Sequence, residues 1–429
     1  MLLRDAILAT LQPPAVERGD LRIEDGRIVA RAPELAPRAG EETVDLAGAL
    51  VLPGFVNAHT HLYSALARGM PPPAEPPRSF VEILEKVWWR LDRALDEEAV
   101  RLSALVGAID AARSGTTLLV DHHASPSFIR GSLDTVRRAV EEVGLRSVLC
   151  YETTDRNGLE ERDAGIAENA AFLAGGPTEL TRARVGAHAS FTLSDESLDR
   201  LAAVADGAGS SAHVHGAEDR ADALDAVRRG AAGVVDRLRR HGLLVRDALL
   251  VHAVHLDERE LRESQRAGAW LVHCPRSNAN NAVGRARVEL FDHAALGTDG
   301  MDEDLLAEAR AAFLRMRDDG RPDAFAAAIG LLAGGHRLAS ALFGEAFGRL
   351  EPGAPADLVV FDYGPPTPLT ADNLAGHLLF GLDRSHVRST MVAGRYVMRD
   401  RAIVTVDEAA VLSQARAAAA RLWERMQAL

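Results

Sequence analysis

Two histidines placed two residues apart are the first sign of chemistry in this sequence. His59 and His61 end the run VLPGFVNAHTH. On a strand, residues i and i+2 face the same side, so both imidazoles would point the same way. His213 and His215 repeat this spacing in SSAHVHGAE, and either could face the same centre. Glu218 follows three residues after His215 and favours His215, because a carboxylate beside a metal-binding imidazole can move protons.

Two further runs carry candidate ligands. In ALLVHAVHL, His252 and His255 are three residues apart and cannot both face inward, and His252 lies nearer the strand. Asp299 ends HAALGTDG, where a carboxylate can coordinate a metal and accept a proton. With only Cys150 and Cys274 in the chain, a cysteine-rich zinc site is excluded, and nitrogen and oxygen ligands suit Zn²⁺, Fe²⁺ or Mn²⁺. Such an ion brings the pKa of bound water towards ~7 and provides a hydroxide nucleophile, which predicts metal-assisted hydrolysis.

These residues lie at the ends of eight similar runs between Leu50 and about Phe347. The first half of each run is apolar and β-branched, the last half carries His, Asp, Glu or Asn, and most runs are followed by an amphipathic helical pattern. The runs are Ala47–His61, Gly115–His123, Arg146–Glu152, Arg184–Phe191, Ser210–Glu218, Ala248–Leu256, Ala269–Asn278 and His293–Gly300. Eight alternating strands and helices predict an α/β fold, a (β/α)8 TIM barrel with its active site at the C-terminal strand ends. Eleven of the fifteen histidines fall within these runs, whereas structural histidines would scatter over the chain.

The two ends of the chain have a different pattern. Residues 1–50 and 351–404 contain strand–turn–strand segments, and Asp25-Gly26 is a two-residue hairpin signal. Neither segment is long enough for a core of its own, so we expect one small β-sandwich built from both termini. Residues 51–350 are then the hydrolase barrel. Residues 405–429 show the three-to-four spacing of an amphipathic helix, which we expect to dock on the body.

An insert follows the first predicted barrel strand. Pro71–Pro77 is a stiff, non-helical loop that would overhang the barrel mouth and could act as a lid. Ser79 and Glu82 form a capping-box pattern that opens the next helix. On that helix we expect Trp88 and Trp89 in the core rather than against a ligand.

Composition excludes several classes of protein. The 62 acidic and 49 basic residues give a net charge of −13, which disfavours nucleic acid as a partner. The N-terminal segment lacks a secretory-leader pattern, and no stretch has the ~18–20 uninterrupted apolar residues of a membrane span. We therefore expect a cytoplasmic protein that does not use a membrane.

The motifs VLPGFVNAHTH, HVHGAE, LVHAVHL, HCPRSN and LGTDG, in this order, resemble the amidohydrolase superfamily. They are closest to its branch with guanine deaminase, methylthioadenosine/adenosylhomocysteine deaminase and the triazine hydrolases. Within that branch, DHHASP, EILEKVWWRLD, ETTDR and PRSNANNAVG resemble the aminohydrolases called SsnA. The resemblance covers essentially the whole chain, including the split β-sandwich.

The resemblance implies one divalent metal ion, which we expect to be Zn²⁺, with Fe²⁺ and Mn²⁺ as alternatives. The implied ligands are His59, His61, His215 and Asp299. His252 is implied either as a further ligand or as a group that contacts the substrate and polarises the attacked carbon. Asp299 would take the proton of the attacking water, and Glu218 would pass a proton to a ring nitrogen.

The single lysine bears on the number of metal ions. Superfamily members with two metals often use a carboxylated lysine on a central strand as a bridge. Lys86, the one lysine, lies on the helix after the first loop. A lysine-bridged pair is therefore excluded, which favours a mononuclear centre.

Polar residues at the other strand ends predict a substrate pocket. The candidates are His122, Arg156, His188, Arg276 and Asn278. Arg156 and Arg276 could bind ring carbonyls or a carboxylate, or could be held in ion pairs; His122 could support the metal site instead. His188 matches a substrate-contacting histidine of the branch.

Hydrolytic deamination of a purine-like N-heterocycle, with release of ammonia, is the leading interpretation. Ring opening of a cyclic amide at the same metal site is the alternative, and a non-catalytic binding barrel is less favoured because no catalytic group is missing. Barrels of this branch often dimerise, which makes a homodimer an open expectation.

Overall fold

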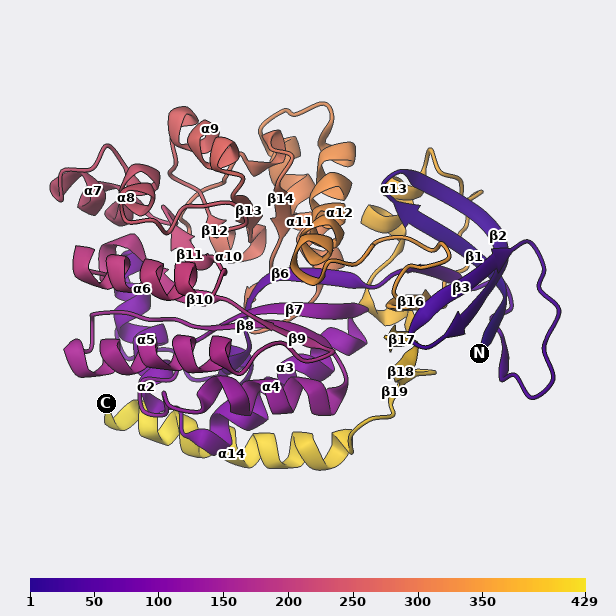
Figure 1. The fold of residues 1–429 in the computed structure, drawn as a ribbon, viewed down its shortest axis with the longest axis horizontal. Helices are drawn as coiled ribbons and strands as arrows, with labels where there is room; N and C mark the ends of the chain where they lie inside the picture. The colour runs from indigo at the N-terminus through magenta and orange to yellow at the C-terminus, as the bar shows by residue number, and fades with distance from the viewer.

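Residues 1–429 are described by the computed structural model, apart from the side chain of Leu290. Parallel strands form the centre of the molecule (Figure 1). They are β6 (Phe55–His61), β7 (Thr116–His123), β8 (Arg146–Tyr151), β9 (Thr181–Ala183), β10 (Val185–Ala189), β11 (Ala212–Gly216), β12 (Leu249–His252), β13 (Trp270–His273), β14 (Ala294–Leu296) and β15 (Asp299–Gly300).

The strands are hydrogen-bonded as two parallel arcs, β15-β6-β7-β8-β9 and β10-β11-β12-β13-β14. One residue, Arg184, separates β9 from β10, and a parallel bridge from Thr153 to Ala187 joins the arcs there. Gly297 and Thr298 separate β14 from β15 in the same way, and β15 pairs with β6. The two arcs are therefore one ring of eight strands, which confirms the predicted TIM barrel.

Helices cover the outside of the ring (Figure 1). They are α3 (Glu97–Arg113), α4 (Ser132–Val143), α5 (Leu159–Ala174), α6 (Asp195–Gly207), α7 (Arg220–Arg228), α8 (Val234–Arg240), α9 (Glu258–Ala267), α11 (Leu305–Asp318) and α12 (Ala324–Phe343). The short helix α10 (Pro275–Asn280) lies at the mouth of the ring instead. Local chemistry sets their ends: Ser194 caps α6, and Asp257 with Glu260 forms a complete capping box on α9. Gly268 then ends α9 in the left-handed conformation that glycine adopts most easily.

Helix α12 packs unusually close to the barrel. A Cβ atom on Gly334 would lie 1.8 Å from the carbonyl oxygen of Ala294 in β14, so only glycine permits this approach. Among the described residues, α12 is the one helix whose length and apolar composition would suffice to cross a membrane. More than half of its most apolar window is buried against the rest of the chain.

Both termini contribute to a second, nine-stranded sheet. Its strands are β1 (Leu2–Leu11), β2 (Pro14–Glu24), β3 (Arg27–Ala32), β4 (Thr43–Asp45), β5 (Leu50–Pro53), β16 (Leu358–Phe361), β17 (Val387–Val392), β18 (Arg395–Arg399) and β19 (Ala402–Ile403), and the short helix α13 (Leu374–Gly376) follows β16. The sheet encloses its own apolar core, with Leu21 and Ile28 from one terminus against Leu358 from the other. Asp25 and Gly26 both have positive φ in the β2–β3 turn, as a two-residue hairpin requires.

One boundary differs from the expected division of the chain. β5 pairs with β1 and β16, so residues 50–53 belong to the terminal sheet rather than to the first barrel strand. The long run Ala47–His61 is therefore two strands that meet at Gly54. Its uniform burial hides this break, because both halves are covered on each side.

The barrel mouth is covered by a separate group of elements. After the proline-rich loop come α1 (Phe80–Ile83), a π-helical segment (Leu84–Trp88) and α2 (Trp89–Ala94). Ser79 accepts a hydrogen bond from the Glu82 amide, which is half of the predicted capping box. The C-terminal helix α14 (Glu408–Ala428) lies along α2 and α3 at the lower edge of Figure 1.

Candidate metal and active site

Three histidines and an aspartate meet at the C-terminal mouth of the barrel. The Nε2 atoms of His59 and His215 are 3.3 Å apart. Asp299 Oδ1 lies 3.5 Å from His59 Nε2 and 3.2 Å from His61 Nε2. Four donors at about 2.1 Å from one ion in tetrahedral geometry lie roughly 3.4 Å apart, so this group fits a divalent metal ion.

The other ring nitrogens are held from behind. His61 Nδ1 donates to the carbonyl oxygen of His122 at 2.6 Å, which leaves its Nε2 free to ligate. His59 Nδ1 lies 2.8 Å from His213 Nε2. Of the two histidines on β11, His215 therefore faces the ligand group, and His213 supports His59.

Electrostatics match a cation at this point. Burial lowers the pKa of His59 to about 4 and that of His215 well below its usual value, which keeps both rings neutral as metal ligands must be. Burial also lowers the pKa of His61, but the hydrogen bond and charge of Asp299 outweigh burial and raise it to about 9. Burial favours the neutral form of Asp299, yet His59 and His61 hold its pKa well below the carboxyl range. Without an ion, the carboxylate of Asp299 thus favours a proton on His61, and a bound cation would take the place of that proton.

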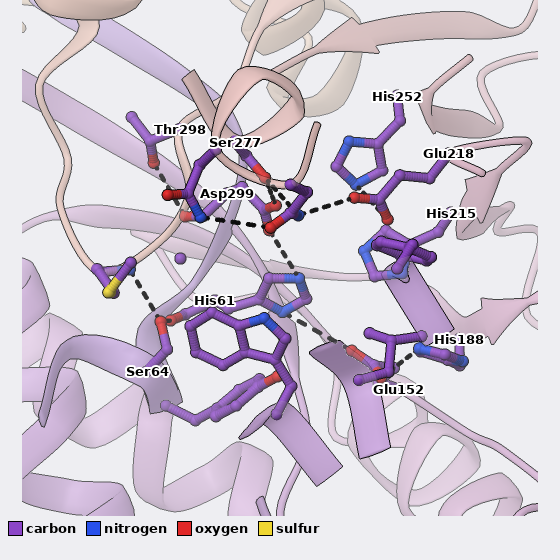
Figure 2. A pocket seen from close by; sticks show the side chains of 18 of the residues that line it. His61, Ser64, Glu152, His188, His215, Glu218, His252, Ser277, Thr298 and Asp299 are labelled. Carbon is purple, nitrogen blue, oxygen red and sulfur yellow. Dashed lines mark hydrogen bonds and ion pairs between the residues drawn. The ribbon is translucent and has the colours of Figure 1, made fainter. Parts of the chain in front are cut away.

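Glu218 and His252 lie beside the ligand group (Figure 2). His252 Nε2 is 3.4 Å from Glu218 Oε2, and Asn281 Nδ2 donates to Glu218 Oε1 at 3.3 Å. Burial raises the pKa of Glu218 well above the usual range, and the charge of Asp299 adds to this. A protonated carboxyl group at neutral pH is suited to donating a proton.

His252 also belongs to a second possible ligand group. One ligand atom each from His59, His252 and Asp299 lie within 4.8 Å of one another. Behind His252, the side-chain amide of Asn278 is 3.0 Å from Nδ1. Asn278 is buried and is not among the described residues that line the cavity, so it positions His252 rather than contacting a substrate.

Several residues at this site have strained backbone conformations. His252, Ala253, Asp299 and Met301 all have φ between 55° and 81°, a region that side-chain-bearing residues rarely adopt. Such conformations cost about 1–3 kcal/mol each and persist where the surroundings enforce them, often at functional sites. Here they turn the side chains of His252 and Asp299 toward the centre of the barrel.

The position of His122 agrees with the expected support of the metal site rather than with a substrate contact. Its ring stacks on His213 with centroids 4.5 Å apart, and it is fully buried. One nitrogen each of His59, His61, His122 and His215 lie within 4.8 Å of one another. Neither ring nitrogen of His122 has a hydrogen-bond partner among the described residues, and His122 is not among those that line the cavity. It lies behind the ligand group rather than in the substrate space.

A cavity of about 230 Å³ opens onto the ligand group (Figure 2). Of the predicted substrate contacts, it exposes Arg156, His188 and Arg276. Arg276 is fully engaged: Nε binds Glu308 at 2.5 Å, and Nη1 and Nη2 bind Asp302 at 2.9 and 2.6 Å. Its contacts are those of an ion-pair network, whereas Arg156 has a single carboxylate partner, Asp92.

Two expectations about the insert are changed by the structure. Trp88 and Trp89 pack against buried apolar residues, as expected, but both also line the cavity together with Phe80 and Leu84. Residues of the loop Pro71–Pro77 are not among the described residues that line it. In the sequence, only the aromatic pair Trp88-Trp89 marked the π-helical segment. Segments of this kind are frequent at functional sites.

Sequence reasoning missed Glu303. Its buried carboxylate accepts from Asn57 Nδ2 at 2.5 Å and from Thr60 Oγ1 at 2.7 Å. Asn57 in turn accepts from the amide of Thr298 at 3.1 Å. Glu303 thus ties β6, which carries His59 and His61, to the segment that carries Asp299.

Comparison with known proteins agrees with this architecture. Residues 50–397 match the amidohydrolase family. The chain is 31% identical over 424 residues to a 5-methylthioadenosine/S-adenosylhomocysteine deaminase of Desulforudis audaxviator, covering 95% of each chain. It is 30% identical over 440 residues to a 5′-deoxyadenosine deaminase of Methanosarcina mazei, covering 99% of each.

The fold also has solved counterparts. The crystal structure of an adenosine deaminase from Xanthomonas campestris with bound zinc superposes with a TM-score of 0.86 at 24% identity. That likeness covers 100% of this chain and 98% of the other. The chain belongs to the amidohydrolase family, and its barrel with a sheet from both termini is the fold of that family.

Proposed function

We propose that this protein is a metal-dependent aminohydrolase that releases ammonia from a purine-like N-heterocycle. The observation that carries the proposal is the convergence of His59, His61, His215 and Asp299 at the base of a cavity, which His61, His215 and Asp299 line together with Glu218 and His252. The relatives named as deaminases support the same reaction class.

One divalent ion is assigned to the four-residue group, and Zn²⁺ is the proposed metal. A neighbour of the same fold holds zinc, and the donor set of imidazoles and one carboxylate suits that ion. When bound, it supplies activation of water at neutral pH. Lys86 pairs with Glu82 on the surface of the mouth, away from the ligand group, in line with a mononuclear centre.

Each remaining side chain has a proposed role at a stated atom. Asp299 accepts the proton of the attacking water, since its carboxylate stays ionised among the histidines. Protonated Glu218 donates to the ring nitrogen next to the carbon under attack, and His252 holds Glu218 through Nε2. Water adds to that carbon. As the carbon–nitrogen bond to the amino group breaks, Asp299 passes its proton to the leaving nitrogen and the Glu218 carboxylate takes the hydroxyl proton, so ammonia leaves with the carbonyl product behind.

The test is ammonia release from the purified chain reconstituted with Zn²⁺, Fe²⁺ or Mn²⁺. The substrates are adenine, guanine, pterin, adenosine, 5′-deoxyadenosine and 5-methylthioadenosine, followed by mass spectrometry of each product. Stoichiometric ammonia and a product heavier by one mass unit are expected. A ring-opened acid without ammonia would make the protein a cyclic amide hydrolase instead.

Glu218→Gln supplies the matched control. Glutamine preserves the size of the side chain but cannot donate the acid proton. Turnover should fall by about 10²–10⁴-fold while metal content stays at the wild-type level. Full activity in this variant would contradict the assigned role.

A further inference from the structure

A second group of polar side chains faces the cavity and has no part in the proposed proton transfers. Glu152 and His188 lie on the other side of His215 from Glu218 (Figure 2). Arg156 joins them in lining the cavity. All three side chains are less than 10% exposed, so their polar atoms meet either one another or a ligand.

The tautomer of His188 follows from its neighbour Thr192. The Thr192 hydroxyl donates its one proton to the carbonyl oxygen of Ala189 at 3.1 Å. His188 Nδ1 lies 2.7 Å from that hydroxyl and is the donor in the arrangement that satisfies both contacts. His188 Nε2 then carries a lone pair and is an acceptor on the cavity side.

Glu152 provides a second acceptor next to it. Its Oε1 lies 3.5 Å from His188 Nε2. The backbone amide of Glu152 donates to the carbonyl of His123 at 2.7 Å, which fixes the carboxylate at the end of β8. Burial raises the pKa of Glu152 to about 7, and its Oε2 also lies 3.5 Å from His122 Nδ1. When Glu152 is ionised, its Oε1 and His188 Nε2 are two neighbouring acceptors that together form a place for an N–H donor from a ligand.

Arg156 adds the opposite polarity. Asp92, itself 1% exposed, pairs with one of its terminal nitrogens, and the guanidinium lies over the Trp89 ring with 5.0 Å to its centroid. This anchoring leaves the rest of a pre-oriented donor fork for the cavity. A carbonyl oxygen of a neutral ligand is a group that the guanidinium of Arg156 can bind in this position.

The cavity is also small. Its volume of about 230 Å³ is below the ~300–1,000 Å³ of sites that enclose drug-sized ligands. Phe80, Leu84, Trp88 and Trp89 supply flat apolar walls around it. These walls suit a planar base, and a sugar with a 5′ substituent would have to extend out of the mouth of the cavity.

We propose that Glu152, His188 and Arg156 form a subsite that reads a lactam edge. The ring N–H binds Glu152 and His188, and the neighbouring carbonyl binds Arg156. The substrate class is then an unglycosylated amino-heterocycle that also carries an oxo group, in contrast to the nucleosides for which the relatives are named. This proposal rests on the proposed deaminase function.

Two substrate pairs test it, because the members of each pair differ by a single oxo group. Adenine and isoguanine share an amino group at C6; 2-aminopurine and guanine share one at C2. We expect kcat/KM for the oxo member of at least one pair to exceed that of its partner, and of adenosine, by about 100-fold. Equal rates within both pairs, or a preference for adenosine, would overturn the proposal.

Arg156→Met and Glu152→Gln locate the effect. Each should reduce the oxo preference by about 10- to 100-fold, the value of a hydrogen bond to a charged group, because the loss falls mainly on the oxo member of each pair. Arg156→Lys should restore part of it. Because the measure is a ratio within one variant, a loss of folded protein does not imitate it. Arg101→Met, which removes an exposed ion pair with Glu142 on the barrel surface, is the matched control and should keep the wild-type ratio.

Binding without turnover separates this proposal from the function on which it rests. Hypoxanthine carries the lactam edge and purine does not, and neither has an amino group to lose. Thermal stabilisation by hypoxanthine but not by purine, abolished in Arg156→Met, would support the subsite even if no ammonia were released. Equal stabilisation by both would overturn it even in an active deaminase.

Discussion

The two sides of the active-site cavity are built in different ways. The ligand side, made of His59, His61, His215 and Asp299, comes from strand ends. Hydrogen bonds hold two of its side chains: the carbonyl of His122 accepts from His61, and the hydroxyl of Ser277 donates to Asp299 at 2.5 Å. On the recognition side, Phe80, Leu84, Trp88 and Trp89 come from short helical segments inserted after β6, and Arg156 from a loop. One ion pair and one aromatic contact hold that arginine.

This contrast separates chemistry from specificity. Strands of a closed barrel hold donor atoms to within a few tenths of an ångström, as a metal ion requires. Loops and short helices tolerate substitution and can fit a different ligand without disturbing the ligand group. We therefore expect changes on the ligand side to abolish turnover and changes on the recognition side to alter which compound is used.

The largest effect is expected where the two histidines of β11 are compared. His215→Ala removes a donor atom and should lower activity by about 10³-fold, equivalent to ~4 kcal/mol, with loss of bound metal. His213→Ala removes only the partner of His59 and should cost about 10- to 100-fold. Metal analysis and ammonia release measure both. Equal losses of activity and bound metal in the two variants would contradict the assignment of His215 as a metal ligand and His213 as a support of His59.

A smaller effect is expected at Glu303, which joins β6 to the Asp299 segment. Glu303→Gln keeps one acceptor but sets an N–H against the donors Asn57 and Thr60, so kcat should fall about 10-fold with little change in KM. Glu168→Gln is the control, since this buried glutamate accepts from the amides of Gly131 and Leu133 far from the site. It should lower the melting temperature and spare kcat. A fall in kcat of the same size in both variants would make Glu303 merely structural.

The residues of the ligand side could be predicted from the sequence, because strand periodicity alone decides which way their side chains point. The i, i+2 spacing of His59 and His61 and the position of Asp299 at a strand end needed no tertiary information. Glu303 lies 243 residues after Thr60, and the residue type alone does not say that the two meet. Arg156 was recognised, but its partner Asp92, 64 residues away on α2, was not. Whether an arginine is free to bind substrate depends on its pairing with charged residues far away in the chain. Such pairing leaves no periodic pattern in the sequence.

Next in size is a shift of the pH profile through Asn281. Glu218 acts as an acid, so kcat/KM is retained below its raised pKa and lost as the pH rises through it. The hydrogen bond from Asn281 lowers that pKa by favouring the charged carboxylate. Asn281→Ala removes this bond, and the basic limb of the kcat/KM profile should move to higher pH. A shift to lower pH would show that another group controls this limb.

The smallest effect is expected from the C-terminal helix, which supports the recognition side from outside. Arg425 Nε donates to the carbonyl of Ala94 at the end of α2 at 2.7 Å, and the side chain is 37% exposed. Because solvent screens this contact, Arg425→Met should cost about 1 kcal/mol of stability, with a rise in KM below about threefold and unchanged kcat. Arg421→Met, on the same helix and paired with exposed Glu98, should leave KM unchanged. Thermal unfolding and steady-state kinetics check both variants. A loss of kcat or of bound metal in Arg425→Met would mean that α14 supports the ligand side as well, so that the two sides of the cavity are not independent.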